Sequence, residues 1–374
     1  MSGISERRRR KPLVFTTKHV FSTPRLDLEI GRSIAATVGY ETYGQLSPAR
    51  DNAILLCHPF AGSSHAAGRY HDNGESAGWW EPLIGPGKAF DTNRFFLVAV
   101  DSLCNLNLRD ATVVTTGPGT LAPETGQVYG NAFPQVTVRD NVRLQRQLLD
   151  ALGITELACV AGPSTGGFVA LEWAVTYPRM VRQVIAVASS HVTTPLFALG
   201  VCQAAIDAIA ADPEEGLVRA TQQFLTLSRS NDWLEAVWGR RTAVASAHPW
   251  ADREGRYAFQ AELEDEARRL ACRFDPDHFR YTARMAILHD ITHGNRDLEV
   301  VAQKIKAEVL LMPISSDILF PPAVSEGLAE RIRAHGGKVE VVEISSSAGH
   351  QASLLEAHRL AEPIMTFLKR PALH

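Results

Sequence analysis

The segment 162–167 reads Gly-Pro-Ser-Thr-Gly-Gly and contains the residue with the clearest chemical potential, Ser164. An apolar run at 157–161 precedes it and a helical pattern at 168–175 follows it, so Ser164 is expected on a tight turn between a buried strand and a helix. Glycines suit positions 162 and 166, because side chains there would collide with the reversing backbone. Such a turn presents the hydroxyl at a helix N-terminus, which favours attack on an acyl group.

A serine hydroxyl is a weak nucleophile near neutral pH, so acyl transfer requires a general base and a group that orients the base. The C-terminal third of the chain offers His350 and Asp317 for these roles. Asp317 follows the segment 309–314, which has the pattern of a buried strand, and His350 lies in the loop after the next expected strand, 339–344. Because the ends of adjacent strands meet at one edge of a sheet, we expect His350 to take the proton of Ser164 and Asp317 to orient the imidazole.

Other interpretations of these residues stay open. Asp317 could instead cap the helix expected after the Pro-Pro pair at 321–322. We favour it as the acid because only Asp317 follows a strongly apolar strand, unlike its competitors Asp275, Asp290 and Asp297. His58 also follows an apolar run, but it precedes Ser164 in the chain. It is therefore predicted to be a structural hydrogen-bonding residue and not the base.

An acyl-transfer site also needs backbone N–H groups that bind the oxyanion of the tetrahedral intermediate. The N–H of Thr165, next to the nucleophile, is the first expected donor. The second is expected from the loop after an early strand, where 58–62 reads His-Pro-Phe-Ala-Gly. We predict the N–H of Phe60 for this role, with Ala61 as the alternative.

Strands and helices alternate through most of the chain, which predicts an α/β fold with a mostly parallel central sheet and helices on both faces. Between 193 and 299 the pattern is helical, without a convincing strand. We predict that 193–299 is a helical cap over the serine, inserted between core segments 15–192 and 300–374. The expected strands are 32–42, 53–58, 95–100, 157–161, 181–188, 309–314 and 339–344, and the expected helices include 138–152, 198–211, 217–227, 258–273 and 276–290.

The composition narrows the class of protein. The 374 residues carry a formal net charge of −3 with both signs mixed along the chain, so no nucleic-acid partner is expected. No apolar stretch approaches membrane-spanning length, so no membrane partner is expected either. The 5 cysteines are scattered, which is typical of reduced packing residues and predicts a cytoplasmic protein. No cofactor motif is found, and residues 1–14, with the run Arg-Arg-Arg-Arg-Lys, are predicted to be a disordered arm.

The chain resembles the homoserine O-acetyltransferase branch of the α/β-hydrolase superfamily over most of its length. The resemblance implies Ser164, Asp317 and His350 as the catalytic triad and Phe60 and Thr165 as oxyanion donors. It also implies acetyl-CoA or another acyl-CoA as donor substrate, a small alcohol as acceptor, a ping-pong cycle through acyl-Ser164 and a homodimer formed through the cap. The motifs that carry it are His-Pro-Phe-Ala-Gly at 58–62, Gly-Trp-Trp at 78–80, Leu-Ile-Gly-Pro-Gly-Lys at 83–88, Thr-Gly-Pro at 116–118, Phe-Pro-Gln-Val-Thr-Val-Arg-Asp at 133–140, the Ser164 turn, Arg-Phe-Asp-Pro at 273–276, the segment 314–322 and Gly-His at 349–350.

Departures from the family pattern concern the acceptor. Gln351 stands where the family has an acid for the ammonium of homoserine, and Gln203 stands where it has an arginine for the carboxylate. A neutral amide that replaces a buried charged contact loses about 2 to 4 kcal/mol of binding. Homoserine is therefore not the expected acceptor. Arg109 is the predicted substrate-binding arginine, with Arg219 and Arg229 as alternatives, and the segment 104–111 is longer and more polar than the family's Gly-Gly-Cys-Gln-Gly stretch.

Three hypotheses follow. The first is an O-acyltransferase, acetyl-CoA dependent, that acts on a small alcohol other than homoserine. The alternative is a carboxylic-ester hydrolase that uses the same acyl-Ser164 intermediate with water as acceptor. The third is a binding protein that uses the same scaffold without catalysis, which the pattern of nucleophile, acid and base disfavours.

Overall fold

The computed structural model describes residues 15–71, 77–123, 125–244, 249–294 and 297–369, and the predicted arm at 1–14 lies outside them. One eight-stranded sheet forms the centre, in the order β1-β2-β4-β3-β5-β6-β7-β8. The strands from β4 to β8 pair in parallel, whereas β1 and β2 join antiparallel at one edge. The predicted fold class is confirmed. The strands are β1 (His19–Asp27), β2 (Ser33–Tyr43), β3 (Ala53–Leu56), β4 (Phe96–Val100), β5 (Cys159–Pro163), β6 (Gln183–Val187), β7 (Glu308–Met312) and β8 (Val339–Val341).

The central strands are apolar because both faces of the sheet are covered. In β3 all side chains are buried, and Leu55 joins one hydrophobic core while Ile54 and Leu56 join the other. The first core also contains buried residues of α1 (Val138–Ala151), α2 (Thr165–Thr176) and α9 (Pro322–Ala334). The second core contains residues of α11 (Ala361–Leu368). These two layers hold the carboxyl ends of the strands in place, and Ser164 and Asp317 follow the ends of β5 and β7.

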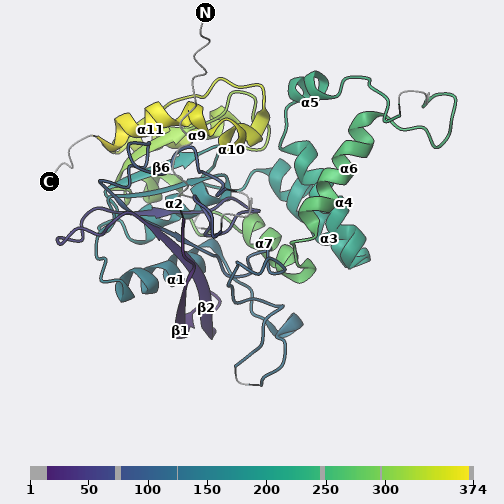
Figure 1. Cartoon of the computed structure of the whole chain (residues 1–374). Helices are drawn as coiled ribbons and strands as arrows, with labels where there is room; N and C mark the ends of the chain where they lie inside the picture. The colour runs from purple at the N-terminus through teal and green to yellow at the C-terminus, as the bar shows by residue number, and fades with distance from the viewer. Residues whose placement is uncertain (1–14, 72–76, 124, 245–248, 295–296, 370–374) are drawn as a thin grey trace, which may run out of the picture.

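Residues between β6 and β7 are largely helical, and we refer to 193–299 as the cap. In Figure 1 its helices form a body to the right of the sheet, with α7 nearest to the core. The short helix α5 was not predicted from the sequence, because none of its residues is buried and it lacks an apolar period. The helical elements of the cap are η2 (Leu196–Gln203), α3 (Ala204–Ala211), α4 (Pro213–Leu227), α5 (Asn231–Val237), α6 (Ala258–Ala271) and α7 (Pro276–Ile287), and α8 (Leu298–Ala302) follows.

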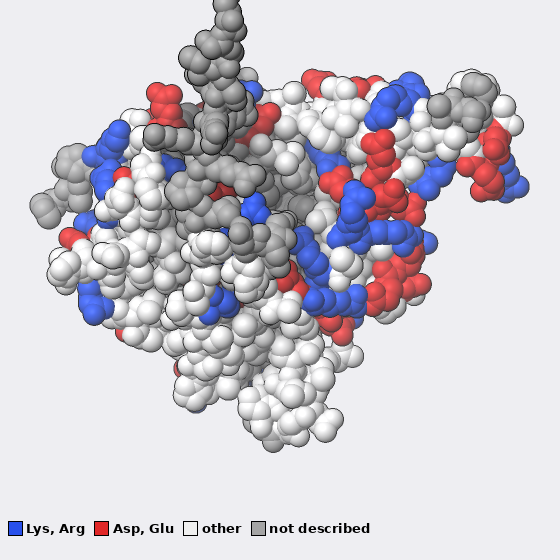
Figure 2. Space-filling model, viewed as in Figure 1, with Lys and Arg blue, Asp and Glu red and all other residues white. Residues whose placement is uncertain are grey.

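The outer surface of the cap is strongly charged. Figure 2 shows acidic and basic side chains side by side over this part of the molecule. Arg268, for example, pairs with Glu215 of α4 and with Glu264 of its own helix. Charges of both signs at such density indicate a solvated surface. Among the described residues no helix is both long and apolar enough to cross a membrane.

Candidate active site

Ser164 lies on the turn between β5 and α2 in a strained backbone conformation, with φ 56° and ψ −127°. The neighbouring glycines are needed for close packing. A Cβ atom at Gly162 would lie 2.5 Å from the carbonyl carbon of Gly166, and one at Gly166 would lie 2.1 Å from the carbonyl oxygen of Cys57. The turn therefore has the geometry expected from its sequence, because a side chain at either glycine would separate the helix from the strands.

Three side chains from distant parts of the sequence form a hydrogen-bonded relay. The hydroxyl of Ser164 lies 2.8 Å from Nε2 of His350, and Nδ1 of His350 lies 2.7 Å from Oδ2 of Asp317. The carboxylate accepts from Nδ1–H, which leaves Nε2 unprotonated to accept from the serine hydroxyl. All three residues are at least 96% buried. The arrangement is that of a nucleophile, its general base and an orienting acid.

The sheet brings the acid and the base together. Asp317 follows β7, and its Oδ1 accepts the backbone N–H groups of Leu319 and Phe320 at 2.8 and 3.1 Å, so Oδ2 is left for the histidine. His350 follows β8, the neighbouring strand, and lies in the short 3₁₀ helix Gly349–Gln351. Asp317 does not cap the helix after the Pro-Pro pair, because α9 has Pro321 at its N-cap without a side-chain cap, and Oδ1 of Asp317 instead fixes the turn at 319–320.

The competing acids have local structural roles. Asp275 and Asp297 accept backbone N–H groups at the starts of α7 and α8, and Asp290 accepts from the backbone and hydroxyl of Thr292. His58 is partly buried, and this burial lowers the pKa of its imidazole. Its Nδ1 donates to the carbonyl of Pro59 at 2.8 Å. His58 is therefore a neutral hydrogen-bonding residue, and it is His350 that contacts the serine.

The predicted oxyanion donors have available N–H groups. Residues 59–62 form a turn closed by a 2.8 Å hydrogen bond from Gly62 N to Pro59 O; we call them the oxyanion turn. Within the described ranges, the N–H groups of Phe60 and Thr165 donate to no protein acceptor. This arrangement leaves both N–H groups able to bind an oxyanion.

Aromatic side chains of the cap cover this turn. The ring of Phe60 has Phe197 of η2, Phe224 of α4 and Phe279 of α7 around it, at centroid distances of 6.1, 5.8 and 5.4 Å. Phe320 continues the cluster to His350 at 5.4 Å. We call these phenylalanine rings around Phe60 the aromatic roof. Such an apolar cover excludes water and strengthens hydrogen bonds within the site.

The predicted substrate-binding residues lie in different places. Gln351 follows His350 directly, and its Nε2 donates to the hydroxyl of Ser228 in the cap at 2.8 Å. Gln203 donates to Asp207 at 2.9 Å, and Arg109 pairs with Glu214 at 2.5 Å. Among the described residues neither of these two contacts the triad. Each instead contacts a cap carboxylate, Gln203 at the i,i+4 spacing of a helix and Arg109 across 105 residues of sequence.

Two further features were not assigned from the sequence. Arg229, held only as an alternative, is 94% buried beside Glu266, yet its Nε and Nη1 have no partner among the described residues. The side chains of Asn105 and Asn107 contact the main chain of the oxyanion turn. The unusual polarity of the segment 104–111 was the available signal for these asparagines.

Known proteins agree with this architecture. The chain matches the family described as alpha/beta hydrolase fold over residues 52–357. It is 35% identical to a homoserine O-acetyltransferase of Moorella thermoacetica, over 96% of this chain and 98% of that protein. A homoserine O-acetyltransferase of Carboxydothermus hydrogenoformans is 33% identical, over 96% of each chain.

Two solved structures are close in shape. The crystal structure of homoserine O-acetyltransferase from Bacillus anthracis has a TM-score of 0.92 and 35% identity, over 96% of this chain and all of that one. The structure of esterase E22 has a TM-score of 0.89 and 32% identity, over 95% of this chain and all of that one. The site therefore occurs in a fold that hosts both transfer and hydrolysis. On these grounds the chain belongs to the homoserine O-acetyltransferase family, acyltransferases of the alpha/beta hydrolase superfamily.

Proposed function

We propose that this chain is a serine-dependent O-acyltransferase that takes an acyl group, acetyl in the first instance, from acyl-CoA and passes it to a small alcohol. The observation that carries the proposal is the relay of Ser164, His350 and Asp317, with contacts of 2.8 and 2.7 Å. The family relationship supports acyl transfer as the reaction class.

In the first half-reaction, Oγ of Ser164 attacks the thioester carbonyl while its proton passes to Nε2 of His350. The carbonyl oxygen becomes an oxyanion, which the N–H groups of Phe60 and Thr165 stabilise. The carbon–sulfur bond then breaks, and the leaving thiolate takes the proton from His350. The products are free thiol and acyl-Ser164, with no bound cofactor required.

In the second half-reaction, the acceptor hydroxyl gives its proton to His350 and attacks the acyl-Ser164 ester. Collapse of the new tetrahedral intermediate releases the acylated alcohol and returns the proton to Ser164. Asp317 stays ionised throughout and stabilises the imidazolium in both halves. The aromatic roof over Phe60 limits access of water, which would otherwise compete with the alcohol.

We propose an acceptor other than homoserine. No acid follows His350, and the amide of Gln351 is engaged with Ser228, so this position offers no charge to an ammonium group. Arg229 favours an acceptor with an anionic group. Its Nε and Nη1 are buried without a hydrogen-bond partner among the described residues, and its main chain lies beside Gly349, the residue before His350.

Hydrolysis is the second candidate. Esterase E22, at 32% identity over nearly the whole chain, supports it, since an esterase would use the same acyl-Ser164 with water as acceptor. The two functions share every catalytic residue proposed above. They differ in how fast water, compared with an alcohol, discharges the acyl-enzyme.

The test is intact-protein mass spectrometry after brief incubation with acetyl-CoA, followed by a chase. An acetyl adduct that persists in water and is discharged by one alcohol from a panel including homoserine and serine is the expected result. Fast discharge by water alone would indicate an esterase. Ser164→Ala is the control, and an adduct on that variant would place the acylated residue elsewhere.

A further inference from the structure

Two buried asparagine side chains donate hydrogen bonds to the backbone carbonyls of the oxyanion turn. Nδ2 of Asn107 donates to the carbonyls of Ala61 and Gly62 at 3.3 and 3.1 Å, and Nδ2 of Asn105 donates to Gly62 O at 3.0 Å. The peptide from Ala61 to Gly62 is thus fixed at both ends, because its N–H closes the turn on Pro59. Fixing this peptide restricts the direction in which the neighbouring N–H of Phe60 points.

The orientation of both amides is determined by their surroundings. Oδ1 of Asn105 accepts the backbone N–H and the side-chain Nδ2 of Asn107, both at 3.0 Å. Nδ2 of Asn105 must therefore point toward the carbonyl of Gly62, and it lies 3.4 Å from Nε2 of His58. His58 accepts there because its other nitrogen donates to Pro59. Every donor in this cluster thus meets an acceptor, and the neutral state of His58 is part of the arrangement.

The segment that contains Asn105 and Asn107 is hydrogen-bonded to the cap. Three consecutive carbonyl groups of this segment accept hydrogen bonds from α7 or its N-cap residue. The pairs are Cys104 with the hydroxyl of Thr282 at 2.6 Å, Asn105 with Nδ1 of His278 at 2.9 Å, and Leu106 with the N–H of Asp275 at 2.9 Å. The cap therefore contributes to holding Asn105 and Asn107 in place, together with Thr115 and Thr116 of the core.

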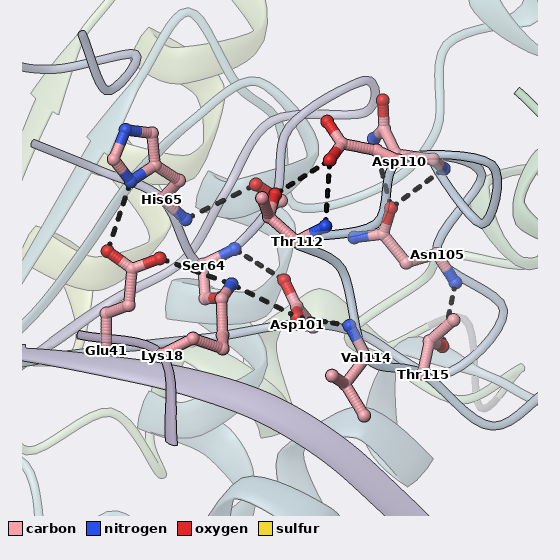
Figure 3. Close-up of polar contacts among 12 residues, drawn as sticks. Lys18, Glu41, Ser64, His65, Asp101, Asn105, Asp110, Thr112, Val114 and Thr115 are labelled. Carbon is pink, nitrogen blue, oxygen red and sulfur yellow. Dashed lines mark hydrogen bonds and ion pairs between the residues drawn. The ribbon is translucent and has the colours of Figure 1, made fainter. Parts of the chain in front are cut away.

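The chain just after the turn is anchored to the core (Figure 3). The N–H of Ser64 donates to Asp101 at 2.6 Å, and Nδ1 of His65 lies 3.2 Å from Glu41. Lys18 lies between the two carboxylates, at 3.2 Å from Glu41 and 3.5 Å from Asp101. Burial raises the pKa of Glu41, but the hydrogen bond from His65 and the charge of Lys18 outweigh it and lower this pKa. The downstream anchor is thus a charged, fully paired cluster.

We propose that Asn105 and Asn107 are positioning residues for acyl transfer. They hold the oxyanion turn in the correct position relative to Ser164, and hydrogen bonds from the cap help to hold the asparagines themselves. The inference rests on the proposed acyl-Ser164 chemistry, and it concerns a segment that departs from the family pattern. Its consequence is that the asparagines affect the tetrahedral intermediate and not the binding of the uncharged substrate.

The test is Asn107→Asp, which keeps the shape of the side chain, removes its donors and sets a carboxylate against two carbonyl oxygens. Stopped-flow acylation by p-nitrophenyl acetate is suitable because a transferase and an esterase would both react. We expect the acylation rate constant to fall about 10²-fold, as for a displaced oxyanion donor. Substrate binding should change by less than about threefold, and affinity for a trifluoromethyl ketone, whose adduct is an oxyanion, should fall with the rate.

Asn52→Asp is the matched control. Its Nδ2 also donates to two carbonyls, those of Gln45 and Arg94 at 3.0 Å each, in a loop at the far end of β3. It should acylate like the wild type. If Asn107→Asp does not fold, Asn107→Ser replaces it. A folded variant with unchanged acylation and ketone affinity would overturn the inference, whereas a wild type that is never acylated would overturn the proposed function and the inference with it.

Discussion

Asp317 divides its carboxylate between two roles, which makes its contribution separable from folding. Asp317→Asn can keep Oδ1 on the backbone N–H groups of Leu319 and Phe320. Its amide would then face Nδ1 of His350 and favour the wrong imidazole tautomer. We expect turnover to fall by about 10³ to 10⁴ with the melting temperature little changed. Steady-state kinetics beside a thermal melt measures both, and near-normal turnover would show that another acid orients the histidine.

Acceptor choice is also decided at single residues. Gln351→Asp would place a carboxylate directly after His350, on a side chain one methylene shorter than the glutamine that contacts Ser228. We expect detectable homoserine acetylation, because a charged contact to the ammonium replaces a neutral amide. The measurement is formation of O-acetylhomoserine from acetyl-CoA by liquid chromatography.

Two comparisons complete this test. Gln351→Glu is the matched control, because it adds the same negative charge on a side chain one methylene longer than that of aspartate. Adding Gln203→Arg to Gln351→Asp should bring little further gain, since Gln203 bonds to Asp207 and does not contact the triad among the described residues. No acetylation in Gln351→Asp would place the specificity difference elsewhere in the pocket.

At the scale of elements, the join of α2 to the sheet depends on glycine. Gly166→Ala would bring a Cβ to 2.1 Å from the carbonyl oxygen of Cys57, which is rigid main chain. We expect a large loss of stability, above about 3 kcal/mol, or failure to fold. Gly327→Ala is the control, because it lies in α9 with nothing within 4 Å of its Cβ position. It should be neutral or stabilising by up to about 1 kcal/mol in urea unfolding.

Elements with strong local signals could be predicted from the sequence. The buried strands β3, β4 and β7 are near-continuous apolar runs, and the start of α1 is marked by Thr137 with Asp140 three residues later. The strand β1 was not predicted, because its side chains are mostly exposed and it is held by antiparallel pairing with β2. Pairing between distant segments leaves little trace in local composition.

The residues of the candidate site also divide into those that could be predicted from the sequence and those that could not. The Ser164 turn and Asp317 follow the buried strands β5 and β7, and His350 follows the short edge strand β8, so chain order and sheet topology together bring them into contact. The partner of Arg109 could not be predicted, because Glu214 is brought to it by the path of the cap, whereas Asp207 lies four residues after Gln203, a spacing at which side chains meet on a helix. The role of the two asparagines depends likewise on the three-dimensional path of a loop.

At the scale of the molecule, a homodimer through the cap stays a prediction. The cap exposes Leu199 of η2 to 67%, beside its charged surface. We expect Leu199→Asp to weaken a cap-mediated dimer, because it places a charge in the apolar part of the contact. Sedimentation equilibrium measures the association. The control is Leu355→Asp, which changes an exposed residue outside the cap. An unchanged association constant would exclude Leu199 from the interface.

Acid stability of the whole molecule should depend on His289, which joins the end of the cap to the nucleophile's helix. Its ring stacks on Phe168 of α2 at 3.9 Å, and its Nε2 donates to the carbonyl of Ser190 at 3.1 Å. Nδ1 is buried without a partner among the described residues, so a second proton there would find no acceptor. Burial accordingly lowers the pKa of His289 from 6.5 to about 3.

The sign of the pH effect follows from this depressed pKa. Above pH 6.5 neither state of His289 is protonated, whereas between 6.5 and 3 the unfolded chain takes up a proton that the folded chain excludes. Stability is therefore lost as pH falls through this window, by about 1.4 kcal/mol per pH unit for this group. In His289→Gln, whose amide can still donate to Ser190, urea unfolding between pH 6 and 4 should have a slope shallower by about that amount. An equal slope in variant and wild type would mean that the acid sensitivity arises at other histidines, such as the partly buried His58 and His191, whose pKa values burial also lowers.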